Sequence, residues 1–93
     1  MQDYEERKLH IKSEKNKAKE LRKSTWWHNL CVNASCYYCQ TKLSPETATM
    51  DHIIPLSQGG TSRPGNVVPS CKPCNTEKKD RSAVEWLLSR GTL

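Results

Sequence analysis

The sequence predicts a small α+β domain that is held together by a metal ion and preceded by an N-terminal helix. Only 34% of its 93 residues are apolar and Phe is absent, so the core is thin and needs a further means of stabilisation. Two Cys-x-x-Cys pairs, Cys36/Cys39 and Cys71/Cys74, provide metal ligands. Short strand-like and helix-like segments follow the first pair and surround the second, which is the pattern of a mixed fold.

The first element is a helix over residues 3–23, which are rich in Glu, Lys, Arg and Ala and contain no Gly or Pro. Its few apolar residues predict a narrow buried stripe. Eight basic residues stand against five acidic ones in this range. Two interpretations stay open: a helix that lies along a phosphate backbone, and a solvated helix with Glu/Lys pairs.

The next segment, "STWWHNLC", places three large apolar residues close together. We expect Trp26, Trp27 and Leu30 to fill the core, with stacking against nucleic-acid bases as the alternative for the tryptophans. Cys31 has no partner at ligand spacing and is interpreted as a small buried residue.

The compact part runs from about Cys36 to Leu88. A turn at Ser44-Pro45 leads into a strand around residues 47–54, and the Gly- and Pro-rich residues 55–65 form a loop. "NVVP" predicts a second strand, and "CKPCNTEKKDRS" opens a helix with Pro73 in its first turn. A last helix over residues 83–90 packs inward through Val84, Trp86, Leu87 and Leu88.

The four paired cysteines offer soft thiolate ligands for one tetrahedral zinc ion with no open position. The alternatives are two disulfides or a redox motif. The duplication argues against a redox motif, whereas the spacing and the odd total of five cysteines argue against disulfides. Zinc binding would then contribute much of the folding free energy.

Composition also limits where the protein acts and which partners it binds. No apolar run is long enough to span a membrane, the first ten residues do not resemble a signal peptide, and we expect a cytoplasmic protein. The formal charge of +5 suits a polyanion such as nucleic acid, although it would also keep a small protein soluble.

Four polar residues between and after the cysteine pairs suggest a chemistry. Asp51 and Asn75 provide hard oxygen ligands that suit Mg²⁺ or Mn²⁺. His52 can take a proton from water near neutral pH. Asn66 lies between the two pairs. A metal, a base and a basic surface together suit phosphodiester hydrolysis.

The segments "CYYC", "MDHIIP", "GG", "NVVP" and "CKPCNTEKK" together resemble the HNH endonuclease family with its ββα-metal fold. The resemblance covers Cys36 to about Arg81. It implies that Asp51 is the first metal ligand, that His52 is the general base, and that Asn66 orients the imidazole from the second strand. Asn75 matches the last metal-ligand position, where many relatives carry His, so the preferred catalytic ion stays open.

The expected function is therefore metal-dependent hydrolysis of double-stranded DNA, by nicking, with low or relaxed sequence specificity and with 5′-phosphate and 3′-hydroxyl products. Zn²⁺ would be structural and Mg²⁺, Mn²⁺ or another divalent ion catalytic. A double-strand break would need two visits by one active site, a homodimer or a larger complex. Residues 1–30 would form a basic helix and linker that pack on a nuclease domain at 31–93.

The alternatives to a nuclease are a non-catalytic zinc module that binds nucleic acid and a protein–protein adaptor. The residues expected to contact DNA are Arg63, Lys72, Lys78, Lys79 and Arg81.

Overall fold

The computed structural model describes residues 4–91 and confirms a small α+β fold. In chain order the elements are α1 (Tyr4–Arg22), α2 (Thr25–Val32), β1 (Thr49–His52), the 3₁₀ turn η1 (Leu56–Gln58), β2 (Val67–Ser70), α3 (Lys72–Lys78) and α4 (Ala83–Ser89).

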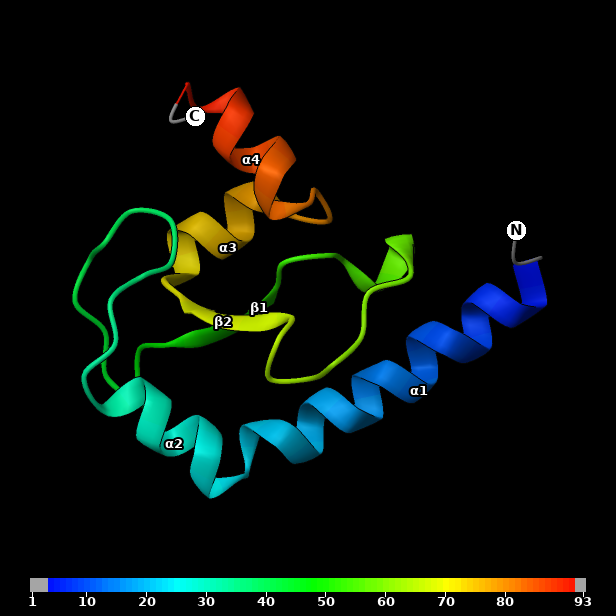
Figure 1. The fold of residues 1–93 in the computed structure, drawn as a ribbon, viewed down its shortest axis with the longest axis horizontal. Helices are drawn as coiled ribbons and strands as arrows, with labels where there is room; N and C mark the ends of the chain where they lie inside the picture. Colours follow the sequence, from blue (N-terminus) through cyan, green and yellow to red (C-terminus); the bar gives the residue numbers. More distant parts are fainter. Residues whose placement is uncertain (1–3, 92–93) are drawn as a thin grey trace.

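The two strands form an antiparallel hairpin in which Thr49 pairs with Ser70 and His52 pairs with Val67. In Figure 1, α1 runs along one side of this hairpin, whereas α3 and α4 lie on the other side. β1 is shorter than the strand expected over residues 47–54, and β2 begins and ends one residue later than the expected strand "NVVP". Residues 47 and 48 belong to a turn, in which the backbone N–H of Ala48 donates to the Ser44 carbonyl.

The N-terminal helix forms as predicted, although Asp3, its expected first residue, lies outside the described residues. Glu14 and Ala18 are its buried residues, four positions apart on one face. Leu9 is 66% exposed, so the buried stripe is narrower than the apolar residues suggest. A buried glutamate therefore takes part in the contact between α1 and the rest of the fold.

The tryptophan segment forms α2, whose first turn is capped by the Ser24 hydroxyl accepting from the Trp27 backbone N–H. Trp27 and Cys31 are buried against Val67 of the hairpin. The expectation that Trp26 and Leu30 also fill the core is wrong, since they are 38% and 40% exposed. Neighbouring helical positions point in directions about 100° apart, so one tryptophan of the pair faces the hairpin and the other does not.

A second buried cluster lies on the side of α3 and α4 and includes Tyr38, Leu43 and Trp86 together with three of the paired cysteines. Trp86 and Leu87 of α4 pack as predicted. Val84 and Leu88 do not, since both are more than half exposed. These two residues are one helical turn apart, and the face of α4 that they share is turned towards solvent.

The loop after β1 depends on two glycines. Gly59 has a φ of +87°, a left-handed conformation that glycine adopts without strain. A Cβ atom on Gly60 would lie 1.8 Å from the Ile54 carbonyl oxygen, so no side chain fits there. Among residues 4–91, no helix has both the length and the apolar character that crossing a membrane requires.

Candidate active site

The four paired cysteines lie together as predicted. Their Sγ atoms are all within 4.8 Å of one another, and those of Cys39 and Cys71 are 3.7 Å apart. Four thiolates around one tetrahedral zinc, with Zn–S bonds of about 2.3 Å, would be separated by about 3.8 Å. The cysteines are thus positioned to bind one metal ion, and the donor set and spacing fit zinc.

Local structure orients these thiols. Cys71 is the N-cap of α3, and its Sγ accepts from the backbone N–H of Cys74. Cys36 Sγ accepts from the backbone N–H groups of Tyr38 and Cys39. Hydrogen bonding to Thr41 is the main cause that lowers the pKa of Cys39 to about 6, which favours the metal-binding thiolate. The metal site therefore joins the 36–39 turn to the start of α3.

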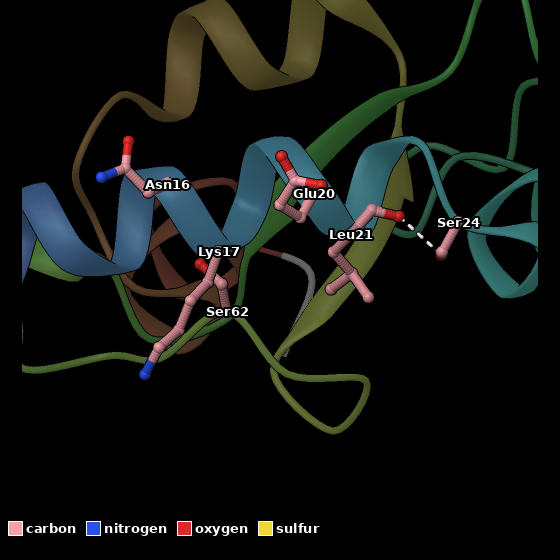
Figure 2. A pocket seen from close by; sticks show the side chains of 6 residues that line it. All are labelled: Asn16, Lys17, Glu20, Leu21, Ser24 and Ser62. Carbon is pink, nitrogen blue, oxygen red and sulfur yellow. Dashed lines mark hydrogen bonds between the residues drawn. The ribbon is translucent and has the colours of Figure 1, made fainter.

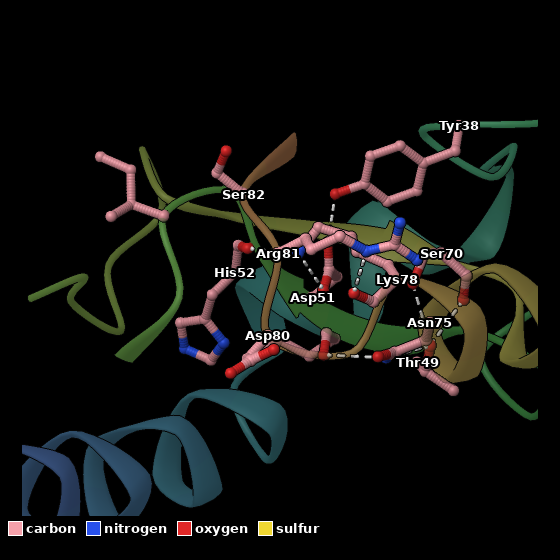
Figure 3. A network of polar contacts seen from close by, with 12 residues as sticks. Tyr38, Thr49, Asp51, His52, Ser70, Asn75, Lys78, Asp80, Arg81 and Ser82 are labelled. Carbon is pink, nitrogen blue, oxygen red and sulfur yellow. Dashed lines mark hydrogen bonds and ion pairs between the residues drawn. The ribbon is translucent and has the colours of Figure 1, made fainter. Parts of the chain in front are cut away.

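Alternation along β1 separates the candidate catalytic residues into two groups. Thr49 and Asp51 face α3, because Thr49 Oγ1 contacts Asn75 and Asp51 contacts Lys78. Met50 and His52 face the other side, where Met50 packs near Trp27. Figure 3 shows the His52 ring turned towards α1 and the Asp51 side chain turned towards Lys78. Asp51 and His52 thus project from opposite faces at the end of one strand.

Asp51 is buried and bound on both carboxylate oxygens. Lys78 Nζ lies 3.2 Å from Oδ1, and the Tyr38 hydroxyl donates to Oδ2. Burial and the hydrogen bond to Asp51 raise the pKa of Tyr38. Lys78 Nζ also donates to the His52 carbonyl oxygen at 3.1 Å.

Lys78 is 1% exposed, so the expectation that it contacts DNA from the surface is wrong. The lysine is the buried counter-ion of Asp51, and it anchors α3 to the strand that carries the Asp-His pair.

Asn75 lies one helical turn before Lys78 on α3. Its Nδ2 donates to Thr49 Oγ1 at 3.0 Å and to the Met50 carbonyl oxygen at 3.5 Å. Its amide oxygen accepts no hydrogen bond from the part of the chain that the structure describes, and it is not enclosed. A carboxylate and an unpartnered amide oxygen on the same side of the hairpin are suitable donors for a hard divalent ion. To bind such an ion, the Asp51 carboxylate would first have to release the ammonium group of Lys78.

His52 is half-buried, and its Nε2 lies 2.9 Å from Ser62 Oγ. Burial is the main cause that lowers the pKa of His52 below its ordinary value of 6.5, so the neutral ring predominates at neutral pH. The other ring nitrogen, Nδ1, has no hydrogen-bond partner within residues 4–91. It is not fully buried either, since Trp86 Nε1 is the one fully buried side-chain nitrogen or oxygen without a partner in that range. Nδ1 is therefore unpartnered and can accept a proton from a water molecule that reaches it.

Asn66 has a different set of contacts from the one expected. Its Oδ1 accepts from the Ile54 backbone N–H, and its Nδ2 donates to the carbonyl oxygens of Ile54 and Thr61. Among the described residues, the ring of His52 bonds to Ser62 and not to Asn66. The prediction that Asn66 orients the ring directly is wrong, because residue 66 precedes β2 and its amide closes the loop between the strands.

Ser62 was missed by sequence reasoning, and so was Tyr38. Neither lies in a pattern that marks it, since their partners are ten or more residues away in sequence. Their roles become visible only in the folded structure, where Ser62 contacts His52 and Tyr38 contacts Asp51 at the end of β1.

The remaining residues expected to contact DNA differ in their surroundings. Arg63, Lys72 and Lys79 are exposed. Arg81 donates to the carbonyl oxygens of Glu77 and Lys78, and its guanidinium lies 4.6 Å from the centre of the Trp86 ring. Arg81 thus contributes to the junction of α3 and α4, and its contact with DNA stays a prediction.

An antiparallel hairpin followed by a helix, joined through four cysteines and carrying an Asp-His pair at the strand end, defines a ββα domain with a metal site. A family model described as HNH endonuclease matches residues 36–85, more than half of the chain. The chain belongs to the HNH endonuclease family.

Two curated relatives match the same part of the sequence. The CRISPR-associated endonuclease Cas9 of Actinomyces naeslundii is 36% identical over 53 residues, which cover 56% of this chain and 5% of that protein. Cas9 of Corynebacterium diphtheriae is 34% identical over 55 residues, which cover 58% of this chain and 5% of that protein. The chain therefore corresponds to a small part of each relative.

Proposed function

We propose that this protein is a metal-dependent endonuclease that hydrolyses DNA phosphodiester bonds. It would nick one strand at a time and leave a 5′-phosphate and a 3′-hydroxyl. The observation that carries the proposal is the His52 ring at the end of β1, whose Nε2 is hydrogen-bonded and whose Nδ1 has no partner among residues 4–91, in a chain of the HNH endonuclease family.

Water is the nucleophile in this proposal. His52 Nδ1 accepts a proton from water while the water oxygen forms a new bond to phosphorus. The bond from phosphorus to the 3′-oxygen breaks, and that oxygen leaves with the electron pair and is protonated by solvent. Because burial already favours the neutral ring, no proton has to leave His52 before the reaction at neutral pH.

Asp51 and Asn75 would hold a divalent ion, Mg²⁺ or Mn²⁺, through a carboxylate and an amide oxygen. Such an ion stabilises negative charge on the phosphate and on the leaving oxygen. Lys78 would have to leave the Asp51 carboxylate when that site is filled. Because Asp51 and His52 project from opposite faces of β1, the proposal also requires the scissile phosphate to lie at the end of the strand, between the two side chains. Through one zinc ion, Cys36, Cys39, Cys71 and Cys74 would fix the start of α3, and α3 contacts β1 through Asn75–Thr49 and Lys78–Asp51.

Exposed lysine and arginine side chains near α3 and the loop would bind the flanking phosphates: Arg63, Lys72 and Lys79. Such contacts do not read bases, so the sequence preference would be low. Each domain has one such site, so a double-strand break would need a second copy or a larger complex.

The proposal is tested by incubating supercoiled plasmid with the zinc-loaded protein in Mg²⁺ or Mn²⁺, with EDTA added to a matched sample just before the DNA. We expect open-circular plasmid in the presence of the ion only, with ends that DNA ligase reseals without kinase treatment. Supercoiled DNA left untouched under both ions would contradict the proposal.

One observation favours a different function, a zinc module that binds nucleic acid without cutting it. Both oxygens of Asp51 are engaged by Lys78 and Tyr38, as in a purely structural ion pair. That function predicts DNA binding at low salt and no cleavage with any divalent ion.

A further inference from the structure

The general base of the proposed reaction is held by a residue from outside the strand that carries it. His52 Nε2 lies 2.9 Å from Ser62 Oγ, in the loop between the strands. The Ser62 hydroxyl is 2.7 Å from the backbone carbonyl oxygen of Glu14 on α1, and the serine is buried. Three segments of the chain thus meet at one hydroxyl group.

The direction of these hydrogen bonds follows from the chemistry of the groups. A carbonyl oxygen can only accept, so the single hydroxyl proton of Ser62 is donated to Glu14. Ser62 Oγ then has no proton left for the imidazole, and it accepts from His52 Nε2–H. A neutral imidazole carries one N–H, so its unprotonated nitrogen is Nδ1, the ring nitrogen that has no hydrogen-bond partner among residues 4–91.

Glu14 holds Ser62 at a second point. Its carboxylate accepts from the Ser62 backbone N–H at 2.6 Å and pairs with Lys17 at 2.9 Å. The hydrogen bond from Ser62 is the main cause that lowers the pKa of Glu14, so the carboxylate stays charged although it is 4% exposed. Figure 2 shows Ser62 beside Lys17, in the pocket that this part of α1 lines.

We propose that Glu14 and Ser62 are positioning residues for the proposed nuclease, through which α1 holds His52 with its proton on Nε2 and its basic Nδ1 free. This proposal rests on the proposed function for its catalytic meaning, but the hydrogen bonds can be tested without DNA. Glu14 lies outside residues 36–85, so the family match does not include this contribution of α1.

The first test is nuclear magnetic resonance of the full-length, zinc-loaded, ¹⁵N-labelled protein above pH 7. We expect a proton on Nε2 of His52 that exchanges slowly with water. The signal is assigned by its loss in His52→Asn, because His10 Nε2 also has a hydrogen-bond partner. Ser62→Ala should lose the slow exchange, and Ser62→Thr, which keeps a hydroxyl, should retain it. A protected proton on Nδ1, or unchanged exchange in Ser62→Ala, would overturn the proposal.

The second test is steady-state cleavage by the same variants with matched zinc content. Ser62→Ala should lower kcat roughly ten- to hundredfold with little change in KM, since the base loses its orientation. Glu14→Ala should lower kcat in the same direction. Glu20→Ala removes the same residue type from the exposed face of the same helix and should leave kcat unchanged. Equal kcat values for Glu14→Ala and Glu20→Ala would count against the role of Glu14.

The two proposals fail in different ways. If no variant and no wild-type sample cuts DNA while the Nε2 proton behaves as expected, the nuclease proposal fails and the hydrogen-bond arrangement stands. If wild-type protein cuts DNA and Ser62→Ala has normal kcat and normal proton exchange, the nuclease proposal stands and the positioning proposal fails.

Discussion

The ammonium group of Lys78 lies 3.2 Å from the carboxylate of Asp51, with 1% and 5% of the two side chains exposed. This ion pair connects α3 to β1 at the point where the proposed divalent ion would bind. Its burial makes it both a structural contact and a competitor for the carboxylate.

Removal of the lysine should destabilise the fold. Lys78→Met leaves the Asp51 carboxylate buried without its counter-ion, and we expect the free energy of unfolding to fall by about 3–5 kcal/mol. Urea unfolding of the zinc-loaded protein without added divalent ion measures this. Lys79→Met, the exposed neighbour, should change stability by no more than about 0.5 kcal/mol. If the two variants unfold at the same urea concentration, the buried pair contributes little to the stability of the fold.

Replacement of His52 tests the base directly. His52→Ala should lower the rate of cleavage by about 10²- to 10⁴-fold, which is the usual contribution of a general base. Zinc content and circular dichroism should stay those of the wild type, because the half-buried His52 belongs to neither of the two buried clusters. A variant that loses zinc or unfolds would indicate a structural histidine instead.

The pH dependence of cleavage should reflect the protonation of the His52 ring. Burial lowers the pKa of His52 below 6.5, and only the deprotonated ring can accept a proton. The rate should therefore be constant above about pH 6.5 and fall as the pH drops further below this value. Zinc content must be measured across the same range, since protonation of the cysteines releases metal. A rate that stays flat into the acid range while zinc remains bound would contradict the role of His52.

Removal of the structural metal should unfold the domain. Two buried clusters are small, and one of them includes three of the four metal-binding cysteines. We expect one zinc per chain by atomic absorption and loss of the folded signal when a strong chelator removes it. Cys74→Ser should bind less than one zinc and unfold. Cys31→Ala, which changes the buried cysteine outside the cluster, should still bind one zinc per chain.

Binding to DNA should depend on the exposed cations of α3 and its C-terminus. Lys72→Ala and Lys79→Ala should each reduce the slope of log affinity against log salt concentration by about 0.9. Thr76→Ala, exposed on the same helix and uncharged, serves as the control. Fluorescence anisotropy with a labelled duplex, in EDTA-free buffer without Mg²⁺, measures the slopes. Identical slopes for all three variants would place the DNA elsewhere on the surface.

Local signals explain why much of the fold could be predicted. The Ala-, Glu- and Lys-rich run specifies α1, Pro73 fits the first turn of α3, and the repeated Cys-x-x-Cys spacing specifies the metal site. These features depend on residues that are close in sequence or on the fixed geometry of one metal ion.

Tertiary contacts explain what could not be predicted. Lys78 stands in the run "EKKDR", where a lysine normally points to solvent, and only the position of Asp51 on the neighbouring strand accounts for its burial. Ser62 and Glu14 are 48 positions apart, so no spacing rule connects them. Asn66 closes a loop instead of contacting the imidazole, because the strand begins one residue after it.

The most direct test of the catalytic arrangement is a crystal structure of the zinc-loaded protein with Mn²⁺ and a short DNA duplex, with the ion located by its anomalous scattering. We predict an ion bound to the Asp51 carboxylate and the Asn75 amide oxygen, Lys78 moved off Asp51, and His52 Nδ1 facing the scissile phosphate. An unbroken Lys78–Asp51 pair with the ion bound elsewhere would contradict this arrangement.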